Sequence, residues 1–286
     1  MAEIIWLASY PKSGNTWTRI FLTNYLHERL DENNFDALEG GPIASSRRIF
    51  DLSVGVEATC LFPSEIKVLR PAAYRIFARD NQGLLFIKTH DAWGHTSRGE
   101  SLFPSDVTRG VVYIVRNPLD VAVSAMHHFG RSLDQVSEQL CDETFTLSGS
   151  DHRVAYQLPQ EVGSWGHHVS SWLDQPDLPV YVMQYEKMLA DPQAAFGGLV
   201  QFAGLDYDPE RLTEAIAASD FETLQQQEQA KGFRERPLRA SAPFFRSGQS
   251  GGWRDVLTPA NVNDLVAAHG PMMSRFGYID EFGQPV

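Results

Sequence analysis

A strand, a glycine-containing loop and a helix follow one another at the start of the chain, and this order constrains the fold most. Residues 4–9 form a short apolar run, as a buried parallel strand does. From Trp17 to Tyr25, apolar side chains recur every three or four positions, which predicts an amphipathic helix. A strand that feeds directly into a helix is the beginning of an α/β fold.

The loop between this strand and helix has the composition of a phosphate cradle. Pro11 ends the strand, and Gly14 lets the backbone turn so that amides at the helix start can converge on an anion. Lys12 adds a positive charge, while Ser13 and Thr16 add hydroxyl donors. The usual P-loop pattern is absent because Lys12 precedes Gly14. Taken alone, the loop also fits a plain strand-to-helix turn with one exposed lysine.

Composition narrows the possible functions. The chain has 286 residues and a net charge of −12, which argues against nonspecific binding to nucleic acid or anionic membranes. Its two cysteines form no C-x-x-C pair and predict neither a metal site nor a disulfide framework. No apolar run is long enough for a membrane span, and we expect no leader because the first predicted strand already starts at Ile4. We therefore expect a soluble cytoplasmic protein.

Further apolar runs at residues 84–88, 110–115 and 180–185 predict three more buried strands, separated by helical segments. This alternation predicts a single α/β domain over residues 1–286, with a central parallel sheet flanked by helices. Residues 31–63 and 231–252 lack periodicity and are expected to form substrate and cofactor loops or lids.

Several element boundaries can be predicted from caps and prolines. Ser64 can cap a helix that begins at Glu65, and Pro71 either interrupts this helix or starts a second one that reaches about Asp80. Residues 130–158 are weakly patterned, and a helix is expected over residues 160–173. Other helices are expected to begin where a capping residue is followed by a proline. The prolines at these expected helix starts are Pro118, Pro192, Pro209 and Pro259.

Polar side chains cluster just beyond three of the predicted strands. Lys12 follows the first strand, Lys88 and His90 end the second, and Arg116 follows the third. Ligands of open parallel sheets bind beyond the carboxyl ends of the strands, so three cations there suggest an anionic ligand. Each residue alone can also be explained structurally. Lys88 can simply end a strand in solvent, and His90 can be a loop histidine bonded to backbone. Arg116 can form a salt bridge with Asp120 at a helix start.

Five segments together resemble the sulfotransferases that use 3′-phosphoadenosine-5′-phosphosulfate (PAPS). Residues 10–17 resemble their 5′-phosphosulfate loop, residues 113–124 their 3′-phosphate segment, and residues 88–90 the segment that carries the catalytic histidine. Residues 185–188 resemble a stretch near the adenine, and residues 246–253 a late glycine-rich loop. The segments occur in the family's order over nearly the whole chain. The resemblance implies a P-loop-like, nucleoside-kinase-like fold.

The resemblance also implies a reaction: transfer of the sulfuryl group from PAPS to a hydroxyl of a small organic acceptor such as a natural product, phenol, alcohol or sugar. By analogy with phosphoryl transfer, the displacement is in line and requires charge neutralisation rather than covalent work. His90 is the implied general base, Lys12 neutralises the leaving phosphate, and Lys88 holds the sulfuryl oxygens. Two alternatives remain open: an ATP-dependent small-molecule kinase and a nucleotide-binding protein without catalysis.

The cofactor contacts follow from the matched segments. Ser124 and Arg116 would hold the 3′-phosphate, with Ser124 also restraining Lys12, so the implied catalytic set is His90, Lys12, Lys88 and Ser124. The implied PAPS contacts are Lys12, Ser13, Gly14, Asn15, Thr16, Trp17, Arg116, Ser124, Tyr185, Ser219, Phe221, Arg246, Ser247 and Gly248. Ser219 and Phe221 come from a weaker alignment at the adenine.

This chain departs from the family pattern at several positions. Asn15 stands where threonine is usual, and Ser247 replaces a lysine, which removes one cation from the 3′-phosphate site. Asp91 replaces an apolar residue and would raise the pKa of His90 if the two side chains met. Residues 254–263 match the family's dimer motif only in part, so monomer and homodimer both stay open.

No metal is expected. The histidine pairs 127–128 and 167–168 lie on predicted helices, where adjacent side chains diverge. The two lysines would serve in place of a kinase's metal ion. The expected partner is a hydroxylated small molecule, with no nucleic acid and no membrane span.

Overall fold

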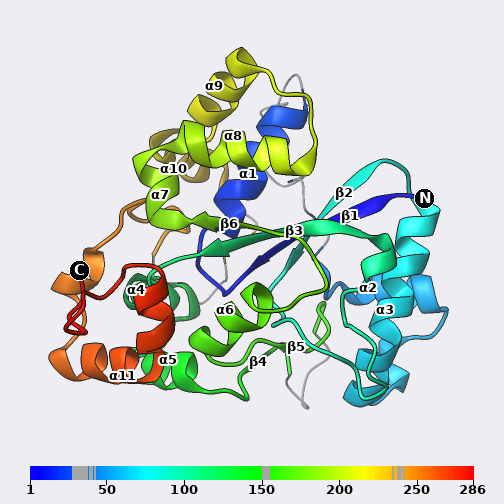
Figure 1. Ribbon diagram of the computed structural model, residues 1–286, viewed down its shortest axis with the longest axis horizontal. Helices are drawn as coiled ribbons and strands as arrows, with labels where there is room; N and C mark the ends of the chain where they lie inside the picture. Colours follow the sequence, from blue (N-terminus) through cyan, green and yellow to red (C-terminus); the bar gives the residue numbers. More distant parts are fainter. Residues whose placement is uncertain are drawn as a thin grey trace. The chain divides into compact units, whose positions relative to one another are not determined.

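The chain forms an α/β fold with a central parallel sheet flanked by helices, as predicted (Figure 1). The computed structural model describes residues 1–27, 38, 41, 43–149, 155–233, 235–236, 240 and 242–286. These residues divide into two compact units. Unit 1 comprises Met1–Tyr10, Gly40–Tyr113 and Glu143–Val182, and unit 2 comprises Pro11–Glu39, Ile114–Asp142 and Met183–Val286.

The sheet has four strands in the order β2-β1-β3-β6. The strands are β1 (Glu3–Ser9), β2 (Leu84–Thr89), β3 (Thr108–Val115) and β6 (Val180–Gln184). β1 and β2 pair in parallel, with Leu7 opposite Lys88. From Ile4 onward β1 is buried, because a strand inside a parallel sheet is covered on both faces.

Helices and short strands complete unit 1. They are α2 (Arg47–Val54), η1 (Ala58–Cys60), α3 (Pro63–Asp80), η2 (Ser105–Val107), β4 (Thr146–Leu147), β5 (Gln160–Glu161) and α6 (Trp165–Leu173). β4 and β5 pair antiparallel as a separate two-stranded sheet. Figure 1 shows α2 lying beside α3, and a shared apolar cluster that includes Phe50, Ile66 and Leu158 joins them.

Three boundary predictions in unit 1 are wrong. α3 begins at Pro63 rather than behind a Ser64 cap, and it runs through Pro71 without a break because both sides of the proline pack into the core. α2 lies inside the stretch expected to be irregular, where Ser46 caps it. α6 begins at Trp165, since Ser164 provides the cap and residues 160–161 are a strand.

Unit 2 is helical. It contains α1 (Asn15–Leu26), α4 (Pro118–Phe129), α5 (Leu133–Cys141), α7 (Tyr185–Ala190), α8 (Pro192–Ala203), α9 (Pro209–Ala218), α10 (Phe221–Lys231), η3 (Gly252–Asp255) and α11 (Pro259–Arg275). In Figure 1, α4, α5 and α11 form one group, and α1, α8 and α9 form another. The four predicted cap-plus-proline starts are confirmed. α5 was not predicted, although Ser132 and Gln135 form a capping box at its start.

Candidate active site

The loop before α1 is shaped by two residues with positive φ. Lys12 has a φ of 72°, and Gly14, which precedes the first residue of α1, has a φ of 108°. A Cβ at Gly14 would lie 2.8 Å from the Tyr185 ring, so the position requires glycine on both conformational and steric grounds. The residue before α1 is Gly14, which has no side chain to cap the helix. The amino end of a helix favours an anion, so the loop before α1 is a candidate anion site.

Polar side chains in the same loop are buried. The Ser13 hydroxyl is buried and has no hydrogen-bond partner among the described residues. Asn15 is also buried. Thr16 donates to Glu235 at 2.9 Å, and the same carboxylate pairs with Arg19. The cradle thus contains polar groups that a buried, uncharged turn would not need.

Arg116 connects three of the segments that the sequence singled out. Its guanidinium donates to the Lys12 carbonyl at 3.3 Å and to the Gln249 carbonyl at 3.0 Å, and it lies over the Tyr185 ring at 4.2 Å. Its buried Nε has no hydrogen-bond partner in the described part of the chain. No ion pair to Asp120 is found among the described residues. Asp120 instead accepts from the amides of Gly251 and Trp253 at 2.7 and 3.2 Å.

The late glycine-rich loop reaches the predicted adenine residues. A Cβ at Gly248 would lie 2.3 Å from the Phe221 ring, and its φ is 59°, so only glycine fits there. Phe221 and Trp17 pack against the same apolar cluster. Trp17 also packs edge-on against Tyr185 at 5.9 Å. Predicted cofactor residues from four segments of unit 2 therefore lie close together.

The remaining predicted cofactor residues of unit 2 differ in their exposure and hydrogen bonding. Arg246 is exposed. The pKa of His127 is lowered mainly by the burial of its own ring and, to a smaller extent, by the positive charge of Arg246. Ser247 is half-buried. Ser219 is fully buried, and its hydroxyl donates to Ala215 and accepts from Asn24. Its predicted role at the adenine stays a prediction.

Lys12 has a neighbour that the sequence did not suggest. Its ammonium lies 3.2 Å from Nδ1 of His128 and 4.1 Å above the Phe244 ring. Ser124, the residue expected to restrain Lys12, is half-buried one helical turn before His128 on α4. Positions four residues apart on a helix share a face, which is the signal that could have identified His128.

In unit 1, the ring of His90 is held by the end of β1. Its Nδ1 lies 2.8 Å from the Ser9 carbonyl oxygen and 3.4 Å from the Ser9 hydroxyl. A carbonyl only accepts, so Nδ1 carries the proton in the neutral ring and Nε2 is the basic nitrogen. His90 is half-buried, as is Lys88 two residues before it. This geometry suits a general base.

Asp91 does not stand beside His90 as an uncompensated charge. Its two carboxylate oxygens accept from Arg70 at 2.8 and 2.5 Å, and both side chains are buried. One oxygen also accepts from the Glu161 amide at 3.1 Å. Burial alone would lower the pKa of Arg70, but Asp91 raises it, so the guanidinium stays charged. Asp91 is thus the partner of Arg70 in a buried ion pair, and its effect on the pKa of His90 stays a prediction.

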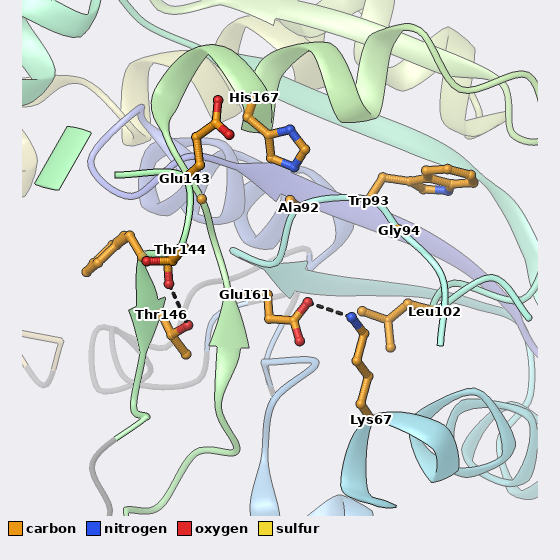
Figure 2. Close-up of a pocket in the computed structure, with 12 residues that line it drawn as sticks. Lys67, Ala92, Trp93, Gly94, Leu102, Glu143, Thr144, Thr146, Glu161 and His167 are labelled. Carbon is orange, nitrogen blue, oxygen red and sulfur yellow. Dashed lines mark hydrogen bonds and ion pairs between the residues drawn. The ribbon is translucent and has the colours of Figure 1, made fainter. Parts of the chain in front are cut away.

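A cavity of about 500 Å³ begins two residues beyond His90 (Figure 2). Its lining residues are Lys67, Ala92, Trp93, Gly94, Leu102, Glu143, Thr144, Phe145, Thr146, Glu161, Gly163 and His167. Lys67 donates to Glu161 at 2.6 Å. Figure 2 shows this pair on one side of the cavity and Glu143 and His167 on another. The wall thus carries carboxylates, hydroxyls and an imidazole alongside apolar groups.

Comparison with known proteins settles the family. Residues 3–277 match the model of the sulfotransferase domain. The chain belongs to the sulfotransferase family. The predicted resemblance is therefore confirmed, and this protein is a sulfotransferase.

Curated relatives are similar to this chain over most of its length, and solved structures share its fold. Cytosolic sulfotransferase 17 of Arabidopsis thaliana is 26% identical over 90% of this chain and 70% of its own, and sulfotransferase 1A1 of Bos taurus is 24% identical over 92% and 80%. A crystal structure of retinol dehydratase with retinol and PAP matches with a TM-score of 0.59 and 21% identity, over 94% of this chain and 81% of its own. The crystal structure of mouse sulfotransferase SULT7A1 complexed with PAP matches with a TM-score of 0.56 and 19% identity, over 98% of this chain and 86% of its own.

In the described ranges, no group of three or more histidine, cysteine, aspartate or glutamate residues is arranged to hold a metal ion. Nor does any helix there combine the length and the apolar character that crossing a membrane requires.

Proposed function

We propose that this sulfotransferase takes the sulfuryl group from PAPS and transfers it to a hydroxyl of a small organic acceptor. The proposal rests on the position of Arg116. Its guanidinium donates to the Lys12 carbonyl in the loop before α1 and to the Gln249 carbonyl in the late glycine-rich loop. An arginine between two such loops, with a buried Nε left without a described partner, fits a site for a phosphate group. The solved relatives complexed with PAP support the same donor.

The residues of unit 2 bind the donor in this proposal. The loop of residues 12–17 receives the 5′-phosphosulfate, because its first-turn amides, Ser13 and Lys12 supply donors and positive charge. Arg116, Ser124 and residues 246–248 hold the 3′-phosphate. Trp17, Tyr185, Ser219 and Phe221 enclose the adenine. PAPS supplies the activated sulfuryl group, and the protein has to orient it and neutralise charge.

His90 and the two lysines carry out the transfer. Nε2 of His90 takes the proton of the acceptor hydroxyl as its oxygen forms a bond to sulfur, and the bond from sulfur to the phosphate oxygen breaks. Lys12 neutralises the charge that develops on the leaving phosphate, and Lys88 binds sulfuryl oxygens. The tautomer imposed by Ser9 supports this role because it makes Nε2 the proton acceptor.

The cavity after His90 is our candidate for the acceptor. It is lined by residues 92–94, which directly follow the proposed base, and its wall offers the carboxylates of Glu143 and Glu161 as hydrogen-bond acceptors. Such a wall favours an acceptor with several hydroxyl groups over a wholly apolar one. Residues 31–63 and 231–252 are proposed to act as substrate and cofactor loops of a single domain spanning residues 1–286; residues 28–37, 39–40, 42, 234, 237–239 and 241 lie outside the described residues.

Release of PAP tests the proposal. The purified protein is mixed with PAPS and with 2-naphthol, a primary alcohol or N-acetylglucosamine, and PAP and sulfated product are quantified by mass spectrometry. We expect PAP release that depends on the acceptor and needs no added metal. Turnover of ATP with magnesium, without PAPS turnover, would favour a kinase instead. Binding of PAP without turnover of any acceptor would favour a nucleotide-binding protein.

A further inference from the structure

Backbone groups of the segment that carries His90 form hydrogen bonds with side chains on one face of α6. The His90 carbonyl accepts from Nε2 of His168 at 3.2 Å, and the Asp91 carbonyl accepts from Nε1 of Trp172 at 2.9 Å. The amide of Trp93 donates to the Ser171 hydroxyl at 3.1 Å. Positions 168, 171 and 172 are three and four residues apart, so they lie on one face of the helix.

His168 has a defined protonation state and orientation. It is fully buried, and burial lowers its pKa to about 3, so the ring is neutral at physiological pH. Because Nε2 faces a carbonyl, it must carry the proton, which makes Nδ1 an acceptor. The Tyr113 hydroxyl donates to that Nδ1 at 2.8 Å. The titratable groups around the ring are Tyr113, Tyr10 edge-on at 5.6 Å, and His167.

These hydrogen bonds run in series from Tyr113 on β3 through His168 to the backbone of His90, the proposed base. Tyr113 on β3 fixes the tautomer of His168, and His168 fixes the peptide group of His90. On the other side of that residue, the Ser9 carbonyl fixes the ring. Two hydrogen bonds from different elements therefore hold the His90 peptide and the His90 ring, and displacement of the peptide would also carry the ring away from the Ser9 carbonyl.

We propose that His168 is a positioning residue for sulfuryl transfer, which holds the His90 peptide so that Nε2 of His90 is presented to the acceptor hydroxyl. This inference rests on the proposed function of His90. It follows from the chemistry of the site, since misplacing a catalytic group by about 1 Å can cost about 10²-fold in rate. An apolar residue in place of His168 would leave the Tyr113 hydroxyl and the His90 carbonyl without this partner.

Substitutions at position 168 separate the hydrogen bond from simple packing. His168→Leu removes the donor, whereas His168→Gln keeps an N–H near the place of Nε2. We expect kcat with PAPS to fall by about 10²-fold in His168→Leu and by less than about tenfold in His168→Gln. The dissociation constant for PAP should stay within about twofold in both. Nitrogen-15 spectra should show the Nδ1-protonated tautomer of His90 in the wild type and in His168→Gln, but a mixture in His168→Leu.

A second buried histidine provides the matched control. His269 is 2% exposed, lies on α11 in unit 2, and has its pKa lowered by burial to about 4. His269→Leu should lower the melting temperature as His168→Leu does, yet leave kcat within about twofold per folded molecule. Tyr113→Phe, which deletes one oxygen, gives an independent reading if His168→Leu does not fold. We expect it to lower kcat several-fold and to leave PAP binding unchanged.

The outcomes distinguish this inference from the proposed function. Wild-type kcat in His168→Leu, or a glutamine variant no better than leucine, would overturn the positioning role. So would an equal loss of kcat in His269→Leu, or, where His168→Leu does not fold, wild-type kcat in Tyr113→Phe. If His90→Asn itself retained wild-type turnover, the assignment of the base would fail first, whatever position 168 did.

Discussion

At the scale of single residues, Arg116 makes contacts that a lysine cannot reproduce. Its two terminal nitrogens bind carbonyls of different loops while its plane lies over Tyr185. We predict that Arg116→Lys weakens PAP binding by at least about tenfold, because a point charge loses the planar fork. Calorimetric titration with PAP measures the effect. Arg109→Lys, at an exposed position 3.7 Å from Glu3, is the control and should bind PAP normally.

The buried pair of Arg70 and Asp91 has a large predicted effect on stability. Asp91→Asn leaves a buried guanidinium without its counter-charge, so the free energy of unfolding should fall by about 3–5 kcal/mol in urea denaturation. Arg75→Leu breaks more exposed ion pairs with Glu100 and Asp106, and should cost about 1 kcal/mol or less. Equal losses in the two variants would contradict the structural role assigned to Asp91.

In the sequence, residues that follow strands stand out more clearly than residues inside helices. Lys12, His90 and Arg116 were singled out because ligands of open parallel sheets bind beyond the strand ends, and their roles stay predictions. His128 and His168 were set aside as members of histidine pairs. Their relevance lies in single contacts, with Lys12 and with the His90 carbonyl, that depend on how a helix packs. The four-residue spacing from Ser124 to His128 was a signal for the first contact, whereas no pattern in the sequence encodes the second.

At the scale of elements, the strands and most helix starts follow from local patterns. Proline at the first helical position and its preceding cap fixed four helices correctly. Pro71 misled the prediction because tertiary packing continues α3 on both sides of it. Residues 160–161 were read as helix because a two-residue strand carries too little pattern to recognise.

Two helices carry buried neutral histidines, and these predict a dependence of stability on pH. Burial lowers the pKa of His168 on α6 to about 3 and of His269 on α11 to about 4, from an ordinary value of 6.5. Below pH 6.5 the unfolded chain therefore binds more protons than the folded chain. The stabilisation is complete above pH 6.5 and declines toward pH 4, by at most about 1.4 kcal/mol per pH unit for each histidine.

Urea denaturation at pH 7.5, 6.5, 5.5 and 4.5 measures this dependence. His269→Gln removes one of the two groups and should flatten the decline between pH 6.5 and 4.5. An unchanged slope in His269→Gln would show that other groups cause the acid sensitivity.

At the scale of the whole molecule, we propose that donor binding and proton transfer fall to different residues. In the proposed function, Arg116 and the loop of residues 12–17 bind the nucleotide, while His90 moves the proton. The two tasks should therefore fail separately when one residue is changed at a time. This separation is what distinguishes the proposed enzyme from a protein that only binds the nucleotide.

The most direct test is to measure, side by side, single-turnover sulfuryl transfer from radiolabelled PAPS and the dissociation constant of PAP in wild type, His90→Asn and Arg116→Lys. We predict that His90→Asn lowers the transfer rate by about 10²- to 10⁴-fold, with PAP binding within about twofold of wild type. Arg116→Lys should weaken PAP binding by at least about tenfold. Transfer at the wild-type rate in His90→Asn, or loss of PAP binding in that variant, would contradict the central claim.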